Sequence, residues 1–292
     1  MKAQKDNDRE KMRKQCAIIF QNTYDLCQKL AVLRESINQS IKFTKLYLEG
    51  HKFCINDKII KSKEYNIIIT PHRTLEAVQK YYIPNLKNRK IGVLNFAAAK
   101  HPGGGVWSGA RSQEESLCRS STLYSCLISD YLKDNYYSFN IEKNSEFCNR
   151  IIYIPNVLVF KSDDNVFAEL LYEKDWYNID IISCAAHNQK AYKLDYGKLE
   201  KINYIKIKAI IECAVENNID NLILGAFGCG AFANPPQLIS KIFKKILIDE
   251  EYYKYFENVH FAIFTTLNET DNLNEFQNTF EKYIKNKYIN QI

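Results

Sequence analysis

The segment KIGVLNFAAA (90–99), followed by HPGGGVWSGARSQEESLCR (101–119), decides how this chain folds and where its chemistry lies. The first ten residues are mostly apolar, which predicts a buried strand. Three consecutive glycines (103–105) follow, in a chain that contains only 10 glycines. Glycine allows backbone N–H groups to converge on an anion without obstruction by a Cβ atom. The sequence therefore predicts a strand that runs into an anion-binding loop.

Predicted strands and helices alternate on both sides of this segment. Helical spacing of apolar residues covers Cys16 to Ile41, after a charged start (1–14) that is expected to be a frayed helix end or a tail. Further helices are expected from Thr74 as N-cap, over 116–132 and 197–218, from Pro235 after an Asn234 N-cap, and from 272. Further strands are expected at 66–70, 150–160, 179–186, 221–226 and 260–266. Several of these strands are almost wholly apolar, which predicts a three-layer α/β/α domain with a helical N-terminal extension.

Composition excludes several classes of protein. Of the 292 residues, 46% are hydrophobic and 25% are charged, so a buried core is expected. The net charge of +6 is compatible with an anionic partner but does not identify one. Nine cysteines, Cys148 among them, occur without a CxxC pair, which favours a reduced protein with buried thiols. The charged N-terminus has no apolar segment, so neither a secretory signal nor a membrane span is expected, and the expected location is cytoplasmic, or nuclear in a eukaryote.

A second glycine-rich segment, GAFGCGAFA (225–233), also follows a predicted buried strand. Both glycine loops should therefore lie at the carboxyl edge of a sheet, where α/β folds bind their ligands. Neither loop has the Rossmann or the Walker pattern, which argues against a redox dinucleotide or an ATPase site. The alternative is that both loops are only tight turns between a strand and a helix.

Two interpretations of Glu115 remain open from the residues alone. SQEE (112–115) fits a capping box, in which Ser112 is the N-cap and Glu115 reaches back to its backbone N–H. In the functional interpretation, Glu115 is a general acid/base beside the glycine loop. Glu114 would point about 100° away on a helix, so the two carboxyls are not expected to face the same ligand atom.

The segment VLNFAAAKHPGGGVWSGARSQEESLCRSSTLY (93–124) resembles the signature of the bacterial-type (microbial) poly(ADP-ribose) glycohydrolases, a branch of the macrodomain superfamily. The shared pattern is three glycines and, after seven intervening residues, Gln-Glu-Glu. Two further blocks resemble the same family in the same order, IIYIPNVLVFKSDD (151–164) and LILGAFGCGAFANPP (222–236). The resemblance implies a macrodomain-like catalytic unit with a mixed sheet (61–292) and a helical extension packed on it (1–60).

The resemblance also implies roles for residues of both loops. Glu115 would be the catalytic residue, with Glu114 positioning the ribose. Gly103, Gly104 and Gly105 would lie against the distal ribose and the diphosphate, and Asn95 would contact that ribose. The backbone N–H groups of Gly228, Cys229 and Gly230 would bind the diphosphate, and Phe227 would pack on the sugars of the nucleotide. The expected ligand-binding set is completed by Val106, Gln113, Gly225 and Phe232.

The implied activity is poly(ADP-ribose) glycohydrolase, which removes ADP-ribose from the polymer end and so reverses ADP-ribosylation. Glu115 would protonate the leaving 2′-oxygen, an oxocarbenium-like centre would form, and the same group would then activate water. Alternatives are a hydrolase of mono-ADP-ribosyl linkages on protein or nucleic acid, a non-catalytic ADP-ribose reader, and a plain α/β scaffold. We expect no cofactor, no metal, no membrane partner and no requirement for nucleic acid, and a monomer. Asp163–Asp164 is interpreted as a solvated turn rather than a metal site.

Two positions depart from the family pattern. His101 precedes the glycines where a smaller or amide residue is expected, and SCAAHNQ (183–189) fits the pattern only loosely. His187 in that segment could line the adenine end of a ligand, but a structural histidine with satisfied hydrogen bonds is the commoner case. These departures affect the details of the substrate more than the fold.

Overall fold

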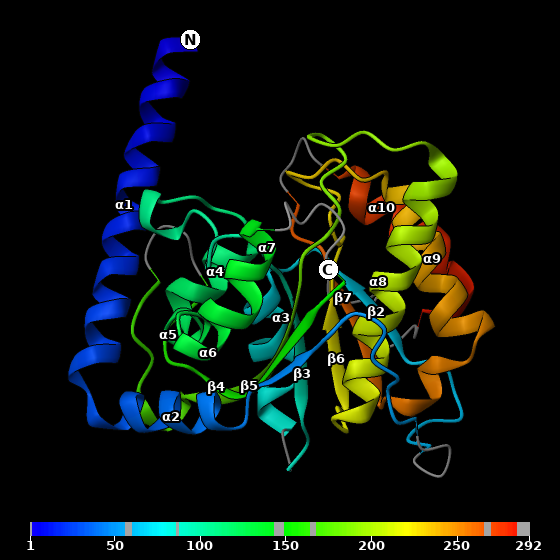
Figure 1. The fold of residues 1–292 in the computed structure, drawn as a ribbon, viewed down its shortest axis with the longest axis horizontal. Helices are drawn as coiled ribbons and strands as arrows, with labels where there is room; N and C mark the ends of the chain where they lie inside the picture. Colours follow the sequence, from blue (N-terminus) through cyan, green and yellow to red (C-terminus); the bar gives the residue numbers. More distant parts are fainter. Residues whose placement is uncertain are drawn as a thin grey trace. The chain divides into compact units, whose positions relative to one another are not determined.

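The computed structural model describes residues 2–55, 60–85, 88–142, 149–163, 168–265 and 270–284 (Figure 1). Cys148, Asp164 and Thr266, which entered the sequence-based expectations, lie outside these ranges. Contacts divide the chain into two compact units. The first comprises Met1–Leu46, Ala97–Ser145 and Ile152–Ser183, and the second Tyr47–Phe96, Glu146–Ile151 and Cys184–Ile292.

The first unit is mainly helical and contains one antiparallel strand pair. Its helices are α1 (Lys2–Lys29), α2 (Ala31–Lys42), η2 (Val106–Ser108), α4 (Gln113–Ser120), α5 (Leu123–Leu127), α6 (Asp130–Leu132), η3 (Lys133–Tyr137) and α7 (Ser138–Glu142). Strands β4 (Ile151–Val159) and β5 (Tyr177–Cys184) pair from Ile152↔Ser183 to Val159↔Tyr177. A short turn, η4 (Glu173–Asp175), precedes β5.

Helix α1 forms because a narrow buried stripe runs along it. Cys16, Phe20, Thr23 and Cys27, spaced by four, three and four residues, are all at most 2% exposed. The stripe contacts η2, α4 and α5. The charged residues before it continue the helix from Lys2, so the expected frayed start is instead regular helix, and the predicted helix from Cys16 to Ile41 is divided at Leu30, which has an extended backbone.

The predicted single helix over 116–132 is wrong, because the chain breaks at Ser121. This residue is extended (φ −146°, ψ 178°), and its hydroxyl donates to the Leu117 carbonyl. Ser121 forms an isolated bridge with Val159, and the N–H of Thr122 donates to the Leu158 carbonyl. The apolar spacing correctly indicated helix on both sides of this point, but side-chain hydroxyls and strand β4 offer the backbone other partners.

The second unit contains a parallel sheet. Strands β3 (Ile91–Phe96), β6 (Asn221–Leu224), β7 (Asn258–Ala262) and β2 (Ile67–Thr70) lie side by side in that order. All the pairs between them are parallel. The other elements of this unit are α3 (Thr74–Tyr81), η1 (Ile83–Asn85), α8 (Tyr196–Glu216), α9 (Pro236–Lys244), η5 (Lys245–Asp249), η6 (Tyr252–Tyr255), α10 (Asp271–Phe280) and η7 (Glu281–Tyr283). The short strand β1 (Lys45–Tyr47) begins in the first unit and ends at the first residue of the second.

Helices cover both faces of this sheet. Helix α3 connects β2 to β3, across the strand order in one direction, whereas α9 connects β6 to β7 in the other direction. Since such connections are right-handed, the two helices must lie on opposite faces, as Figure 1 shows. The described strands thus include parallel and antiparallel pairs, and the expected α/β fold with a mixed sheet and a helical N-terminal extension is confirmed. The domain boundary at residue 60 stays a prediction.

Two predicted helix caps are displaced by one residue. Arg73, not Thr74, is the N-cap of α3, and its N–H donates to Glu76 Oε2 (3.1 Å). Pro235, not Asn234, is the N-cap of α9, so Pro236 occupies the first helical position. Among the described residues, no helix combines the length and hydrophobicity needed to cross a membrane.

Candidate active site

The loop between β3 and α4 is built on glycines in the left-handed region. Gly103 and Gly104 have φ values of +68° and +59°. The N–H of Gly104 donates to the His101 carbonyl (2.9 Å), and the N–H of Val106 donates to the Gly103 carbonyl (3.2 Å). This tight double turn leaves the N–H of Gly105 directed at the first turn of α4.

Glu115 receives that N–H. Its Oε1 accepts from Gly105 N at 2.9 Å, and the residue is 7% exposed. Glu115 Oε2 is also buried, and no hydrogen-bond partner for it is found among the described residues. The predicted capping box is therefore wrong. Ser112 is the N-cap of α4, as expected, but its side chain makes no capping hydrogen bond, and the Glu115 carboxyl bonds to the glycine loop instead.

Glu114 lies beside it and holds the start of the same loop. This residue is 2% exposed, and its Oε2 accepts from Ala98 N at 2.8 Å. A Cβ atom on Gly104 would lie 2.5 Å from Glu115 Oε1 and 3.2 Å from Glu114 Oε2. The two carboxyls, which were expected to diverge, thus both lie against one glycine. They converge because both side chains leave the first turn of α4.

The two carboxylates raise the pKa of neighbouring titratable groups. Burial raises the pKa of Cys118 well above its ordinary value, and Glu114 and Glu115 raise it further. Burial likewise raises the pKa of Tyr137, with Glu114 again adding to the effect. Both groups are therefore protonated and uncharged at neutral pH, so neither places a second negative charge beside the two carboxyls.

Arg119 is a further residue at this site that sequence reasoning missed. It is 1% exposed, and its Nη1 donates to the Ala110 carbonyl at 2.7 Å, which fixes the segment between the glycines and α4. Burial lowers the pKa of Arg119, while Cys16, Glu115 and Asp163 oppose that effect. A guanidinium stays protonated in proteins, so it places a positive charge near Glu115. The spacing of four residues from Glu115 was the signal that could have identified it.

Two other residues of the first unit, Asp163 and Trp107, also make unexpected contacts. Asp163 accepts from the Ser116 hydroxyl, so it anchors α4 rather than forming a solvated turn. Trp107 packs edge-on against Phe20 (4.8 Å between ring centroids), and its Nε1 donates to the Tyr124 hydroxyl (2.7 Å). Helix α1 thereby supports the loop that follows the glycines.

The second glycine loop is organised by Asn234. The Asn234 side chain is buried, and its Nδ2 donates to the carbonyls of His187 (2.8 Å) and Gly228 (3.1 Å). Its Oδ1 accepts from Asn203 Nδ2 at 3.1 Å. Gly228 has φ +74°, and a Cβ atom there would lie 2.6 Å from Asn234 Nδ2. The residue expected to cap α9 instead fixes the shape of the loop.

Hydrogen bonding leaves several N–H groups of this loop available, those of Gly228 and Gly230 among them. The N–H of Cys229 donates to the Ala226 carbonyl at 3.1 Å. For the N–H groups of Gly228 and Gly230, no acceptor is found within the described part of the chain. Burial raises the pKa of the Cys229 thiol to about 12, so this cysteine is neutral. Phe227 is completely buried and lies edge-on to Phe96 (5.9 Å).

The other expected residues are placed as follows. Val106 is buried at the start of η2, and Gln113 is half-buried as the first residue of α4. In the second unit, Asn95 is buried in β3, Gly225 is buried after β6, and Phe232 is half-buried. His187 is buried, and its Nε2 is 2.7 Å from the Tyr192 carbonyl, which supports the structural interpretation of this histidine.

Comparisons with known proteins identify the family. The family model described as "Microbial-type PARG, catalytic domain" matches residues 13–162. The structure of poly(ADP-ribose) glycohydrolase (PARG) from Thermomonospora curvata is similar, with a TM-score of 0.80, 26% identity, and 91% of this chain and 99% of that chain covered. The same enzyme bound to the inhibitor ADP-HPD gives a TM-score of 0.77 at 26% identity, with the same coverage of both chains.

A second organism gives the same result. The PARG of Deinococcus radiodurans in complex with ADP-ribose matches with a TM-score of 0.70 and 25% identity, covering 84% of this chain and 97% of that chain. No curated protein matches the chain significantly. These similarities confirm the macrodomain-like α/β/α fold that the sequence resemblance implied.

Proposed function

We propose that this chain, which belongs to the microbial-type PARG family, is a poly(ADP-ribose) glycohydrolase that hydrolyses the ribose–ribose bond and releases ADP-ribose. The matched structures hold ADP-ribose and the inhibitor ADP-HPD as ligands, which supports the same ligand class here. The second glycine loop has the features of an anion site, a tight turn and backbone N–H groups without an acceptor among the described residues, whereas the first loop holds the Glu115 carboxyl.

Glu115 is the proposed general acid/base, and its hydrogen bonding is the observation that carries the proposal. One carboxyl oxygen is held by Gly105 N–H, while the other is buried without a partner among the described residues. A buried oxygen that lacks a partner costs free energy, so it is suited to bind or release a proton at a substrate. A non-catalytic reader has no need for such a group.

The proposed reaction uses this one oxygen twice. Glu115 donates its proton to the 2′-oxygen of the leaving ribose as the bond from that oxygen to the anomeric carbon breaks. The resulting carboxylate then takes a proton from a water molecule, whose oxygen bonds to the cationic anomeric carbon. The products are ADP-ribose and a polymer that is one unit shorter. Glu114 holds the loop through Ala98 N–H and is proposed to position the ribose.

The second loop is proposed to bind the diphosphate of the same class of ligand. The N–H groups of Gly228 and Gly230 are available as donors, and Asn234 keeps the loop in its observed shape. Asn95, Val106, Gln113, Gly225, Phe227, Cys229 and Phe232 stay proposed ligand-binding residues on the strength of the family resemblance. Release of terminal units, a monomeric enzyme and a cytoplasmic location are parts of the same proposal.

The test is hydrolysis of labelled poly(ADP-ribose) by the wild type and by Glu115→Gln, with ADP-ribose affinity measured alongside. We expect Glu115→Gln to lose activity by about 100-fold or more and to keep its affinity. The matched control is Glu173→Gln, which removes an exposed carboxylate from the same unit. Chromatography of the products separates single units from oligomers and so tests the direction of attack.

Other outcomes favour other functions. Binding of ADP-ribose without release by the wild type would indicate a reader. Release from a mono-ADP-ribosylated protein but not from the polymer would indicate the alternative linkage. If the wild type neither binds nor hydrolyses these ligands, the proposal fails.

A further inference from the structure

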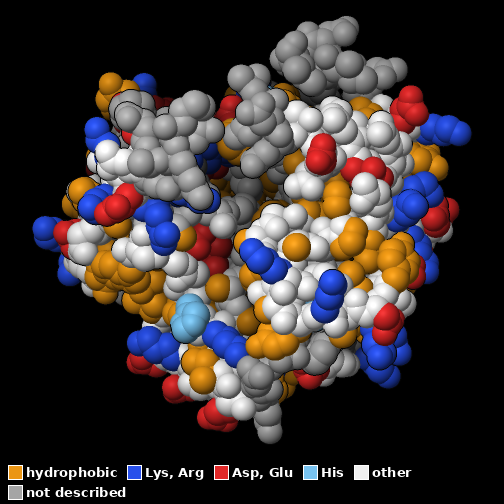
Figure 2. All heavy atoms as spheres, turned by 90° about the horizontal axis from the view of Figure 1, so that it is seen from above, with side chains coloured by type: hydrophobic (Ala, Val, Ile, Leu, Met, Phe, Trp, Pro, Cys, Tyr) orange, Lys and Arg blue, Asp and Glu red, His pale blue; other side chains and the backbone are white. Residues whose placement is uncertain are grey.

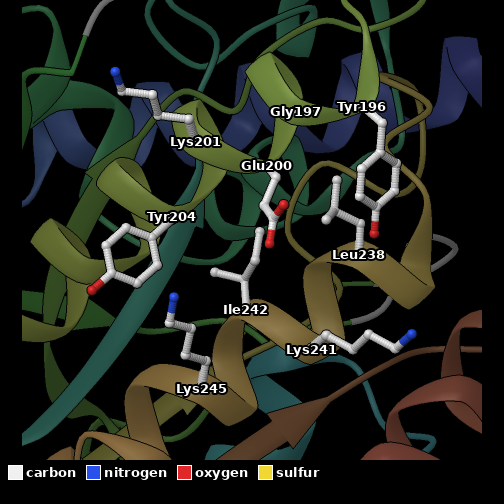
Figure 3. Close-up of a pocket in the computed structure, with 9 residues that line it drawn as sticks. All are labelled: Tyr196, Gly197, Glu200, Lys201, Tyr204, Leu238, Lys241, Ile242 and Lys245. Atoms are coloured by element: carbon white, nitrogen blue, oxygen red, sulfur yellow. The ribbon is translucent and has the colours of Figure 1, made fainter.

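A groove between α8, α9 and the start of η5 lies outside both glycine loops (Figure 3). Its volume is about 370 Å³, within the usual range for small-ligand sites. All the residues that line it belong to the second unit. They are Tyr196, Gly197, Glu200, Lys201, Tyr204, Leu238, Lys241, Ile242 and Lys245.

We propose that this groove binds nucleotide units of poly(ADP-ribose) that are not undergoing hydrolysis, as an additional chain-binding site. The inference rests on the proposed function, because that function supplies the polymer. An ADP-ribose unit offers a diphosphate, an adenine ring and ribose hydroxyls. The groove offers a matching group for each of the three.

Lysines supply the complement to the diphosphate. Lys201, Lys241 and Lys245 are exposed at the groove, and Figure 3 shows the amines of Lys201 and Lys241 directed outward at its rim. For Lys201 and Lys241, no ion pair occurs within the described part of the chain.

Three other lysines in or next to these helices are paired with carboxylates. Lys198 pairs with Asp195 (3.2 Å), Lys208 with Glu250 (2.7 Å) and Lys244 with Asp249 (2.8 Å). The lysines around the groove are therefore paired, whereas the groove itself is lined by three lysines and one carboxylate, Glu200. On the face drawn in Figure 2, basic and acidic side chains are interspersed. A local excess of cations next to a hollow favours a phosphate-bearing ligand.

Tyrosines supply the surface for the base. Tyr196, the first residue of α8, is 60% exposed. The ring of Tyr204 lies 4.8 Å from Lys245 Nζ, and its hydroxyl donates to Glu250 Oε1 at 2.6 Å, which fixes its orientation. Aromatic side chains interleaved with cations are the usual way to bind single-stranded nucleotide chains without sequence preference.

The remaining groups fit the sugar and the base edge. Glu200 projects into the middle of the groove, towards Ile242 (Figure 3). A carboxylate repels phosphate but accepts hydrogen bonds from ribose hydroxyls and from the adenine amino group. A purely inorganic anion would gain nothing from Glu200 or Leu238. The combination therefore favours a nucleotide over a phosphate ion.

The experiment measures the affinity of long labelled poly(ADP-ribose) over a range of salt concentrations, in a Glu115→Gln background so that the polymer is not degraded. The test variant is Lys201→Gln with Lys241→Gln. The matched control is Lys52→Gln with Lys63→Gln, two exposed lysines of the same unit. We expect the slope of log affinity against log salt to fall by about 1.4 in the test variant, the value for two lost phosphate contacts. In a second variant, Tyr196→Ala, affinity should fall by roughly 5- to 150-fold.

Each outcome decides the question. Wild-type affinity and slope in both variants would overturn the proposal, as would equal competition by heparin, which carries anionic groups but no adenine. With Glu115 intact, hydrolysis of a two-unit oligomer should be unchanged in the lysine variant. If the wild type hydrolyses that oligomer but the groove variants bind the long polymer normally, only the groove proposal fails. If the wild type does not hydrolyse it, the proposed function fails.

Discussion

Replacing Gly104 with alanine should separate the role of the glycine loop from that of the carboxyl. Gly104 has φ +59°, where an L-residue costs roughly 1–2 kcal/mol. The added Cβ atom would also lie 2.5 Å from Glu115 Oε1, so the carboxyl must move. Movement breaks its 2.9 Å hydrogen bond with Gly105 N–H, which at a charged acceptor contributes roughly 1.5–3 kcal/mol. We therefore expect Gly104→Ala to lose roughly 2.5–5 kcal/mol of stability in total.

Its catalytic effect should be larger than its effect on binding. Displacement of Glu115 should lower kcat on poly(ADP-ribose) by about 100-fold, the lower end for loss of a general acid/base, with KM little changed. Urea denaturation and initial rates on the same preparations give both quantities.

Two glycines serve as matched controls. Gly50 has φ +77° with nothing within 4 Å of an added Cβ, so Gly50→Ala carries the backbone strain alone. Gly197→Ala carries neither strain nor collision. If Gly104→Ala kept the kcat of Gly50→Ala, the argument that this glycine makes room for the catalytic carboxyl would be refuted.

Three further predictions concern stability and pH. Burial lowers the pKa of Lys161 to about 8, so the unfolded chain binds more protons between pH 8 and pH 10.5 and the free energy of unfolding rises with pH across that window. Urea titrations of the wild type should show this rise, by about 2 kcal/mol after allowance for solvent screening, relative to Lys161→Met. Burial also lowers the pKa of His260 to about 3, well below the unfolded value, so its contribution is complete above pH 6.5 and is lost on acidification. Between pH 7 and pH 4 the wild type should lose roughly 3 kcal/mol more than His260→Gln in chemical denaturation, and parallel pH profiles would contradict this. Asn234→Ala leaves the His187 and Gly228 carbonyls without their donor, so thermal unfolding should show a loss of roughly 2–4 kcal/mol, and calorimetry should show weaker ADP-ribose binding. Unchanged binding despite the lost stability would mean that the loop does not hold the ligand.

The sequence predicted the parts of this molecule that depend on local pattern. Apolar runs located the strands, and the three glycines with Gln-Glu-Glu located a loop and a helix start. The structure places Glu114 and Glu115 in the first turn of α4, against that loop.

What the sequence could not predict are partners that are distant along the chain. The capping box assigned Glu115 to a donor three residues away, but Gly105, ten residues away, presents its N–H to the same oxygen. Asn234 is a residue type that often caps helices, yet its side-chain amide donates a hydrogen bond to the His187 carbonyl, 47 residues away. In both cases residue type indicated a polar side chain that needs a partner, and only the tertiary fold determined which partner it has.

The contact between α1 and the catalytic loop has a practical consequence for protein engineering. The Arg13 carbonyl lies against Gly109 so closely that any Cβ atom there would collide with it, and the Arg13 side chain donates to Ser108. These contacts with α1 stabilise the loop that carries the glycines. A truncated or fused version of the protein that begins after Arg13 would keep every proposed catalytic side chain but would lose these stabilising contacts. Any shortened or fused version should therefore keep the first helix intact, or include a replacement for these contacts.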